Sequence, residues 1–120
     1  MANNYVRPGE SINFVNGASP VVSGQVVRVG NLLGVALGDI AANATGVVGF
    51  GVFTVPKVSA AVIAQGASVL WDASAAAFDV NTATPATGDV SGPPAVATIA
   101  AGNGATTVSI LFTGVPGTVT

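Results

Sequence analysis

The ionisable side chains limit the chemistry that this chain could perform. The sequence has five acidic and three basic residues, and it contains neither histidine nor cysteine. Histidine is the commonest general base and the commonest zinc ligand, so its absence removes most acid–base and zinc chemistry. The absence of cysteine excludes disulfides and thiolate nucleophiles. Ser59, which precedes a short apolar segment, has no histidine with which to form a catalytic triad.

The acidic residues suggest two further kinds of site. Asp72 and Asp79 could face each other across a hairpin, as the carboxylate pair of a glycoside hydrolase does. Such a pair needs an apolar cleft around the acid, and the sequence favours turn or solubilising positions at strand ends instead. Possible oxygen ligands for calcium are Asp39, Asp72, Asp79, Asn81 and Asp89. No Asp-x-Asp-x-Asp-Gly loop joins them, so the sequence predicts no metal site. Since these residues also form no convincing catalytic group, we expect no cofactor and no enzymatic activity.

Two single residues, Lys57 and Trp71, are further candidate functional groups. Lys57 is a lone amine after Pro56, and a surface lysine that closes a strand explains it better than a Schiff-base lysine. Trp71 could stack on a sugar, but a single tryptophan next to Val69 and Leu70 is more often a core or interface anchor. The sequence therefore favours structural roles for both side chains.

The composition predicts a surface that is poor in charge. Charged residues make up 7% of the chain, against about 25% in typical domains, while 50% of the residues are hydrophobic and only 6% are aromatic. Much of the surface must then be small and neutral, which suits a subunit in an assembly, a secreted protein or a virion protein. Three basic residues and a net charge of −2 argue against a nucleic-acid partner. Neither a membrane span nor the apolar run of a signal peptide is present in the sequence.

The stretch Gly46–Lys57 is the element around which we expect the chain to be organised. From Val47 to Val55 it has no charge and many β-branched and aromatic residues, so the pattern predicts one central strand with two apolar faces. Gly49 and Gly51 fall on the same face and allow another segment to approach closely. Pro56 would end the strand.

The remaining elements are short strands joined by turns. Hairpins are predicted around Gly30-Asn31, 73–76 and 102–104, with strands over 25–29 and 32–37, 68–72 and 77–80, and 94–100 and 106–112. One short helix is predicted at Ser59–Gly66, with Ser59 as its cap. Asn81–Pro94 is predicted to be a long loop. The fold class is all-β, a small β-barrel or β-sandwich of about eight short strands.

We expect residues 1–120 to form a single β domain with distinct ends. Residues 1–8 form an N-terminal arm that Pro8-Gly9 separates from the first strand. Residues 114–120 form a turn-rich tail that is either mobile or in contact with a partner. The arm either adds itself to a neighbour's strand edge or pairs within its own barrel.

Several stretches follow one another in an order known from a viral protein family. They are Met1–Glu10, Gly30–Ala36 (Gly-x-Leu-x-Gly-Val-Ala), Gly51–Lys57 (similar to Gly-Val-Phe-x-Leu-Pro-Lys), Val69–Asp72 (similar to Val-Tyr-Trp-Asp) and, more loosely, Ala97–Phe112. Over most of its length the chain resembles the small capsid cement, or decoration, proteins of tailed bacteriophages. It departs from their pattern where Gly92-Pro-Pro-Ala-Val-Ala replaces an Ile-Gly-x-Ala strand, because Pro93-Pro94 would block strand pairing.

The resemblance implies a structural virion protein that binds the outer surface of a phage capsid and stabilises the shell. Its partners would be the major capsid protein and itself, as a homo-oligomer in which we favour a trimer over a dimer. The protein would be assembled in the host cytoplasm and located on the outer capsid surface of the virion.

The expected capsid or subunit contacts lie in the arm and at one tryptophan. The residues are Asn3, Asn4, Tyr5, Arg7 and Trp71. In this interpretation Tyr5 supplies an amphipathic anchor and Arg7 a charge-assisted contact. A second hypothesis is a carbohydrate-binding or adhesin-type β module on a virion or cell surface, because Trp71, Tyr5 and the asparagine-rich turns would suit glycan binding.

Overall fold

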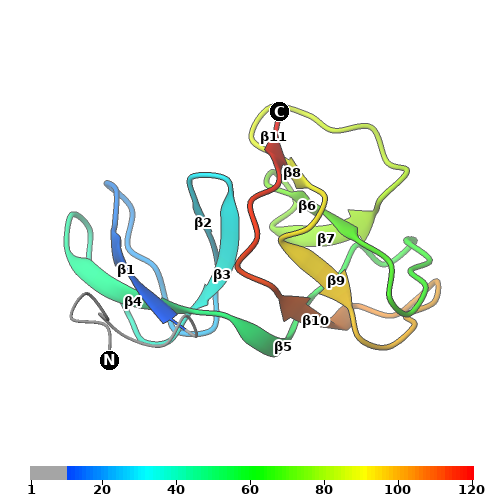
Figure 1. Cartoon of the computed structure of the whole chain (residues 1–120), viewed down its shortest axis with the longest axis horizontal. Coiled ribbons are helices and arrows are strands. Elements are labelled where there is room, and N and C mark those ends of the chain that lie inside the picture. Colours follow the sequence, from blue (N-terminus) through cyan, green and yellow to red (C-terminus); the bar gives the residue numbers. More distant parts are fainter. Residues whose placement is uncertain (1–10) are drawn as a thin grey trace, which may run out of the picture.

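The computed structural model describes residues 11–120, which fold into eleven short strands (Figure 1). The strands are β1 (Ser11–Val15), β2 (Val26–Val29), β3 (Leu32–Ala36), β4 (Thr45–Gly49), β5 (Gly51–Pro56), β6 (Val69–Asp72), β7 (Ala77–Val80), β8 (Val90–Ser91), β9 (Ala95–Ala97), β10 (Thr107–Phe112) and β11 (Thr118–Val119). No part of residues 11–120 is helical. The predicted all-β class is confirmed, and the expected short helix is wrong.

The strands form three antiparallel sheets. Their orders are β1-β4-β3-β2, β5-β10-β9 and β11-β8-β6-β7. In Figure 1 the first sheet lies at the left, and the other two lie at the right. The largest cluster of buried side chains includes Val26, Leu33 and Val35 from the first sheet together with residues of both other sheets. Packing through this shared core joins the sheets into one domain.

The three predicted hairpins are present. Strands β2 and β3 pair from Val29 opposite Leu32, and Gly30 between them has a φ of 59°. Strands β6 and β7 pair across the predicted turn, and β9 pairs with β10. Residues that tolerate a positive φ close such tight turns, and Gly30 is that residue in the β2–β3 hairpin.

The predicted central strand is wrong because the chain bends at Phe50 and enters a different sheet. Strand β4 pairs with β1 and β3, whereas β5 pairs with β10. Gly51 has a φ of 116°, which an L side chain rarely adopts. The close approach expected at both glycines holds only for Gly49, where an added Cβ would lie 2.7 Å from a Leu37 methyl carbon. The space around Gly51 is open.

The segment predicted as a helix instead wraps around Lys57. The Lys57 Nζ donates hydrogen bonds to the carbonyl oxygens of Val58 at 2.7 Å, Ser59 at 3.1 Å and Ala61 at 2.5 Å. The Ser59 carbonyl also accepts a hydrogen bond from the Gly104 N–H at 2.7 Å, so its backbone partner lies in a distant segment and not four residues further along a helix. Only 4% of Lys57 is exposed, so the predicted surface position is also wrong.

Aromatic rings occupy the centre of the core. Phe112 of β10 packs edge-on against Phe53 of β5 and Phe78 of β7, with ring centroids 6.0 Å and 5.9 Å away. Phe78 in turn packs against Trp71, with centroids 4.9 Å apart. Edge-to-face pairs of this kind add to the free energy gained by burying the rings.

The long loop and the tail contribute two strands that were not predicted. Strand β8, at Val90–Ser91, lies within the predicted loop, and β11 pairs with it. Strand β8 ends at Ser91 and β9 begins at Ala95, so Pro93 and Pro94 lie between the two strands, where they interrupt no pairing. The tail also contacts the β2–β3 turn, because Gly117 N–H donates to the Asn31 carbonyl at 2.8 Å and the Asn31 side chain donates back at 3.0 Å. The structure has eleven strands where the sequence predicted about eight. The additional ones are β8, β11 and the strand gained by the division of the central strand into β4 and β5.

Candidate interaction surfaces

The aspartates considered as catalytic or metal-binding groups accept hydrogen bonds from their own chain. Asp72 Oδ1 accepts hydrogen bonds from the Ser74 hydroxyl at 2.8 Å and from Ala75 N–H at 3.2 Å. Asp79 Oδ1 accepts from the N–H of Val80 at 2.7 Å. Within residues 11–120, no three acidic side chains come together in a group that could hold a metal ion. The structure thus supports the turn assignment for Asp72, whereas Asp79 lies within β7 and binds the N–H of the next residue.

Asp89 is the buried member of this set and fastens the long loop. Its two carboxylate oxygens accept hydrogen bonds from the N–H groups of Ala73 at 3.0 Å and Ala86 at 2.9 Å. The first bond reaches the β6–β7 turn and the second stays within the loop before β8. Both oxygens therefore bind backbone of their own chain, which leaves Asp89 a structural role.

Trp71 belongs to the core of the chain. Only 8% of its surface is exposed, and its indole packs against Phe78. Sugar stacking needs an open ring face, so the carbohydrate-binding hypothesis loses this support. Contact between Trp71 and a capsid or another subunit stays a prediction. The other expected contacts, Asn3, Asn4, Tyr5 and Arg7, lie outside the described residues.

The outward face of the sheet β5-β10-β9 is the first candidate surface. Alternation along β10 turns Val108, Ile110 and Phe112 into the core, and Leu111 outward. Leu111 pairs with Val52 of β5 on one side and Val96 of β9 on the other. Val52 is 59% exposed and Leu111 is 37% exposed. These three residues form an apolar row across the sheet.

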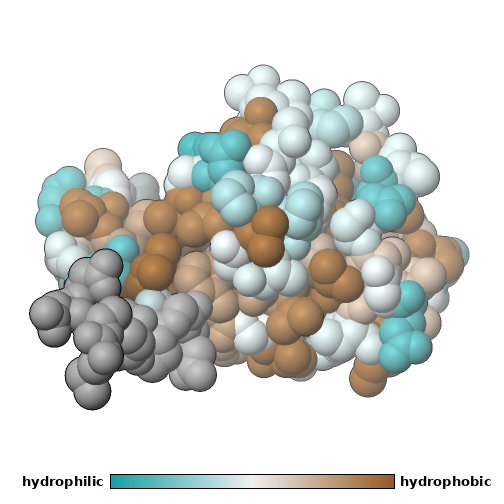
Figure 2. All heavy atoms as spheres, viewed as in Figure 1, coloured by the Kyte–Doolittle hydropathy of each residue, from teal (hydrophilic) through white to brown (hydrophobic). Residues whose placement is uncertain are grey.

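A row of hydroxyl groups lies beside this apolar row. Thr54 pairs with Ser109, and the Thr98 hydroxyl donates to the Ser109 hydroxyl at 2.7 Å. Strands β5, β9 and β10 contain no charged residue. Hydrophobic residues gather over the place where Figure 1 puts these strands (Figure 2). We call the two rows together, with the residues Val52, Val96 and Leu111 and Thr54, Thr98 and Ser109, the β5-β10-β9 face.

A hollow of about 350 Å³ adjoins the β5-β10-β9 face. It is lined by Thr54 of β5, by Thr107, Val108 and Ser109 of β10, and by Ile99–Gly102 and Ala105 from the connection between β9 and β10. Ile99, one of these lining residues, is largely exposed. The hollow has no charged lining residue, so it suits an uncharged side chain of a partner.

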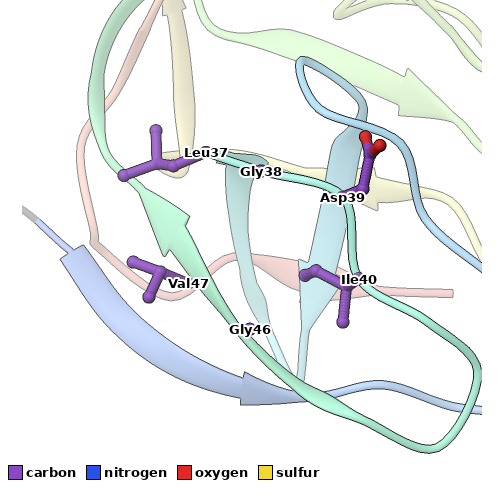
Figure 3. A pocket seen from close by; sticks show the side chains of 6 residues that line it. All are labelled: Leu37, Gly38, Asp39, Ile40, Gly46 and Val47. Atoms are coloured by element: carbon purple, nitrogen blue, oxygen red, sulfur yellow. The ribbon is translucent and has the colours of Figure 1, made fainter.

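A second hollow of about 390 Å³ lies on the β1-β4-β3-β2 sheet (Figure 3). Leu37 and Val47 are exposed at one side of it, and the Leu37 N–H donates to the Val47 carbonyl at 3.0 Å. The Asp39 carboxylate points away from these apolar side chains (Figure 3) and accepts from the Ser23 N–H at 2.8 Å. A side chain at Gly46 would collide with Ile40, 2.3 Å away, so glycine keeps this packing possible. The hollow is apolar, with one acid at its rim.

Sequence reasoning missed both surfaces, although the alternation in β10 contained a signal for the first. Leu111 stands between Ser109 and Thr113 on the outward side of an otherwise polar pattern. An apolar residue at such a position is exposed unless a partner covers it.

Comparison with known proteins identifies the family. A family model described as phage cement protein matches residues 6–112. The chain belongs to the phage cement protein family. No curated protein and no solved structure matches it. Membership in this family makes it a structural, virion-associated protein, in agreement with the resemblance seen in the sequence. Within residues 11–120, no helix is long and apolar enough to span a membrane.

Proposed function

We propose that this cement protein binds the outer surface of a phage capsid and stabilises the shell, without enzymatic activity. The observation that carries the proposal is a surface with few charges and many exposed apolar side chains in a member of a cement family. Exposed valine, leucine and isoleucine occur on both the first sheet and the β5-β10-β9 sheet. Large apolar areas on a small protein mark sites of contact with other proteins.

The partners in this proposal are the major capsid protein and further copies of the cement protein, with a trimer favoured over a dimer. A domain of this size buries only about 60–70% of the surface of its unfolded chain, so apolar side chains in excess of one small core remain for intermolecular contacts. Copies linked to one another at neighbouring lattice sites dissociate together, so a modest affinity at each site suffices. Assembly would take place in the host cytoplasm, and the final location would be the outer capsid surface.

The experiment that tests the proposal measures decoration of shells that lack the protein. Purified protein is mixed with such shells, bound protein is quantified after sedimentation of the particles, and the shells are heated. Binding in near-stoichiometry with the major capsid protein, together with a higher melting temperature of the shell, is the expected result. Full-length, folded protein that leaves the shells bare would refute the proposal.

A further inference from the structure

The β5-β10-β9 face carries an inference about which partner covers it. Charged side chains normally protect an exposed sheet from association. Of the charged side chains described with some exposure, Arg28 lies on β2, Asp39 follows β3, and Asp72 and Asp79 lie on β6 and β7. None of these belongs to the β5-β10-β9 sheet. The face therefore lacks the usual protection against a second protein.

The distribution of charge favours a second copy of the same chain as that protein. The chain has a net charge of −2, so two copies repel each other wherever their acidic groups approach. Contact through a face without charge brings no like charges together.

The apolar character of the face also favours a contact formed between copies over one formed with the shell. Interfaces of permanent homo-oligomers are more apolar than those of proteins that exist free before they bind. A cement protein must remain dissolved before it reaches the shell. An exposed row of Val52, Leu111 and Val96 would oppose that, whereas the same row covered by another copy would not.

We propose that the β5-β10-β9 face is the contact between copies of this chain, and that the adjoining hollow receives a side chain from the neighbouring copy. This inference rests on the proposed function, because it names the surface through which the cement protein would form its homo-oligomer. The surface that meets the shell would then lie elsewhere on the molecule.

A charge introduced into the face tests the inference. Val52→Lys places an ammonium group in the apolar row, and burial of an unpaired charge strongly disfavours association. The matched control is Val22→Lys, because Val22 is 61% exposed, close to the 59% of Val52, and lies outside the β5-β10-β9 sheet. Sedimentation of the full-length protein should show at least a tenfold higher concentration for half-dissociation in Val52→Lys, roughly the effect of losing one central interface residue. Val22→Lys should sediment as the parent does.

A second variant gives the same answer even where the lysine variant does not fold. The chain has no cysteine, so a single introduced thiol is a specific reporter. In Thr54→Cys the thiol should react slowly with a maleimide at concentrations where the protein is oligomeric, and rapidly after dilution to monomer. In Val22→Cys it should react rapidly at both concentrations.

The outcomes separate this inference from the proposed function. A parent protein that is monomeric at micromolar concentration, or rapid labelling of Thr54→Cys in an intact oligomer, would overturn the inference. Protection of that thiol only when shells are added would also overturn it, because the face would then meet the shell. Protection in the free oligomer supports the inference, and whether that oligomer goes on to decorate shells tests the proposed function by itself.

Discussion

Phe112 of β10 and Phe78 of β7 pack edge to face across two sheets, with ring centroids 5.9 Å apart. Both rings are completely buried. Phe112 also contacts Phe53, and Phe78 also contacts Trp71, so this pair connects the aromatic residues of one sheet with those of the other. The position of the β5-β10-β9 sheet, and of the outward face that it presents, therefore depends on this pair.

Removal of the Phe78 ring should destabilise the fold more than any substitution at the bend of the chain. Phe78→Ala should lower the free energy of unfolding by about 3–5 kcal/mol, the usual cost of emptying a buried phenylalanine site. Phe50 is only half-buried and packs at the edge of the same cluster, so Phe50→Ala should cost less, roughly 1–3 kcal/mol. Denaturant unfolding of the two variants compares them directly. Equal losses would contradict the assignment of Phe78 to the centre of the core.

Gly51 should be sensitive to substitution because of its backbone and not because of its surroundings. Its φ of 116° strains any L side chain, although an added Cβ would meet no atom within 4 Å. Gly51→Ala should cost more than about 1 kcal/mol, as expected for alanine at a positive φ. Gly17 is the control, since it also has open space and no such φ, and Gly17→Ala should leave the melting temperature unchanged or raise it. A Gly51→Ala protein as stable as the parent would argue against the bend.

The hairpins could be predicted from the sequence because their signals are local. Gly30-Asn31 lies between two apolar runs, and the turn that it forms needs only the conformations of those two residues. The same holds for the β6–β7 and β9–β10 pairs. Their registers follow from the alternation of core residues such as Val108, Ile110 and Phe112.

Two of the wrong predictions, the single central strand and the short helix, concern segments whose structure depends on distant or unusual contacts. In the stretch 46–57 the apolar pattern is the same whether the strand is straight or bent, and only the φ of Gly51 distinguishes the two. In the stretch 59–66 the apolar residues fit a helix, but the Ser59 carbonyl binds the Lys57 ammonium group and the N–H of the distant Gly104. Neither effect is visible in hydrophobic periodicity.

Lys57 should contribute strongly to stability, unlike an ordinary lysine on a surface. Lys57→Met would remove three hydrogen bonds and leave the buried Ala61 carbonyl without its partner. Hydrogen bonds to charged groups are worth about 1.5–3 kcal/mol each, so a loss of at least 2 kcal/mol in the free energy of unfolding is expected. The control is Arg28→Met, because the Arg28 side chain is exposed and its bond to the Gly30 carbonyl is long, at 3.4 Å. Comparable unfolding curves for the two variants would show that the buried ammonium group is dispensable.

The candidate site was less predictable than the fold. The sequence identified the family and the shortage of charge, both of which are visible residue by residue. The pairing of β10 with β5 and β9 decides which apolar residues remain exposed. It places Leu111 next to Val52, which is more than fifty residues away in the sequence. Trp71 is among the capsid or subunit contacts expected from the sequence because tryptophan is common at interfaces. Its burial results from packing against Phe78, which the type of residue alone does not indicate.

The N-terminal arm, which lies outside the described residues, is a predicted contact. Deletion of residues 2–7 stops before β1, which begins at Ser11, so every described strand is kept. We expect the deletion protein to fold, as checked by circular dichroism, and to bind shells more weakly, because an extended arm can add to a neighbouring strand edge through its backbone. A Tyr5→Ala, Arg7→Ala double variant keeps the length of the arm and separates the contribution of these side chains from that of the backbone.

The melting temperatures of the free protein and of decorated shells distinguish the two expectations for this arm. Pairing within its own chain predicts a lower melting temperature of the free deletion protein, since strand pairs and their backbone hydrogen bonds would be lost. Contact with a subunit of the shell predicts an unchanged melting temperature of the free protein and a smaller thermal shift of the shells. A deletion protein that decorates shells and raises their melting temperature as the full-length protein does would eliminate the arm as a contact, while the proposed cement function would stand.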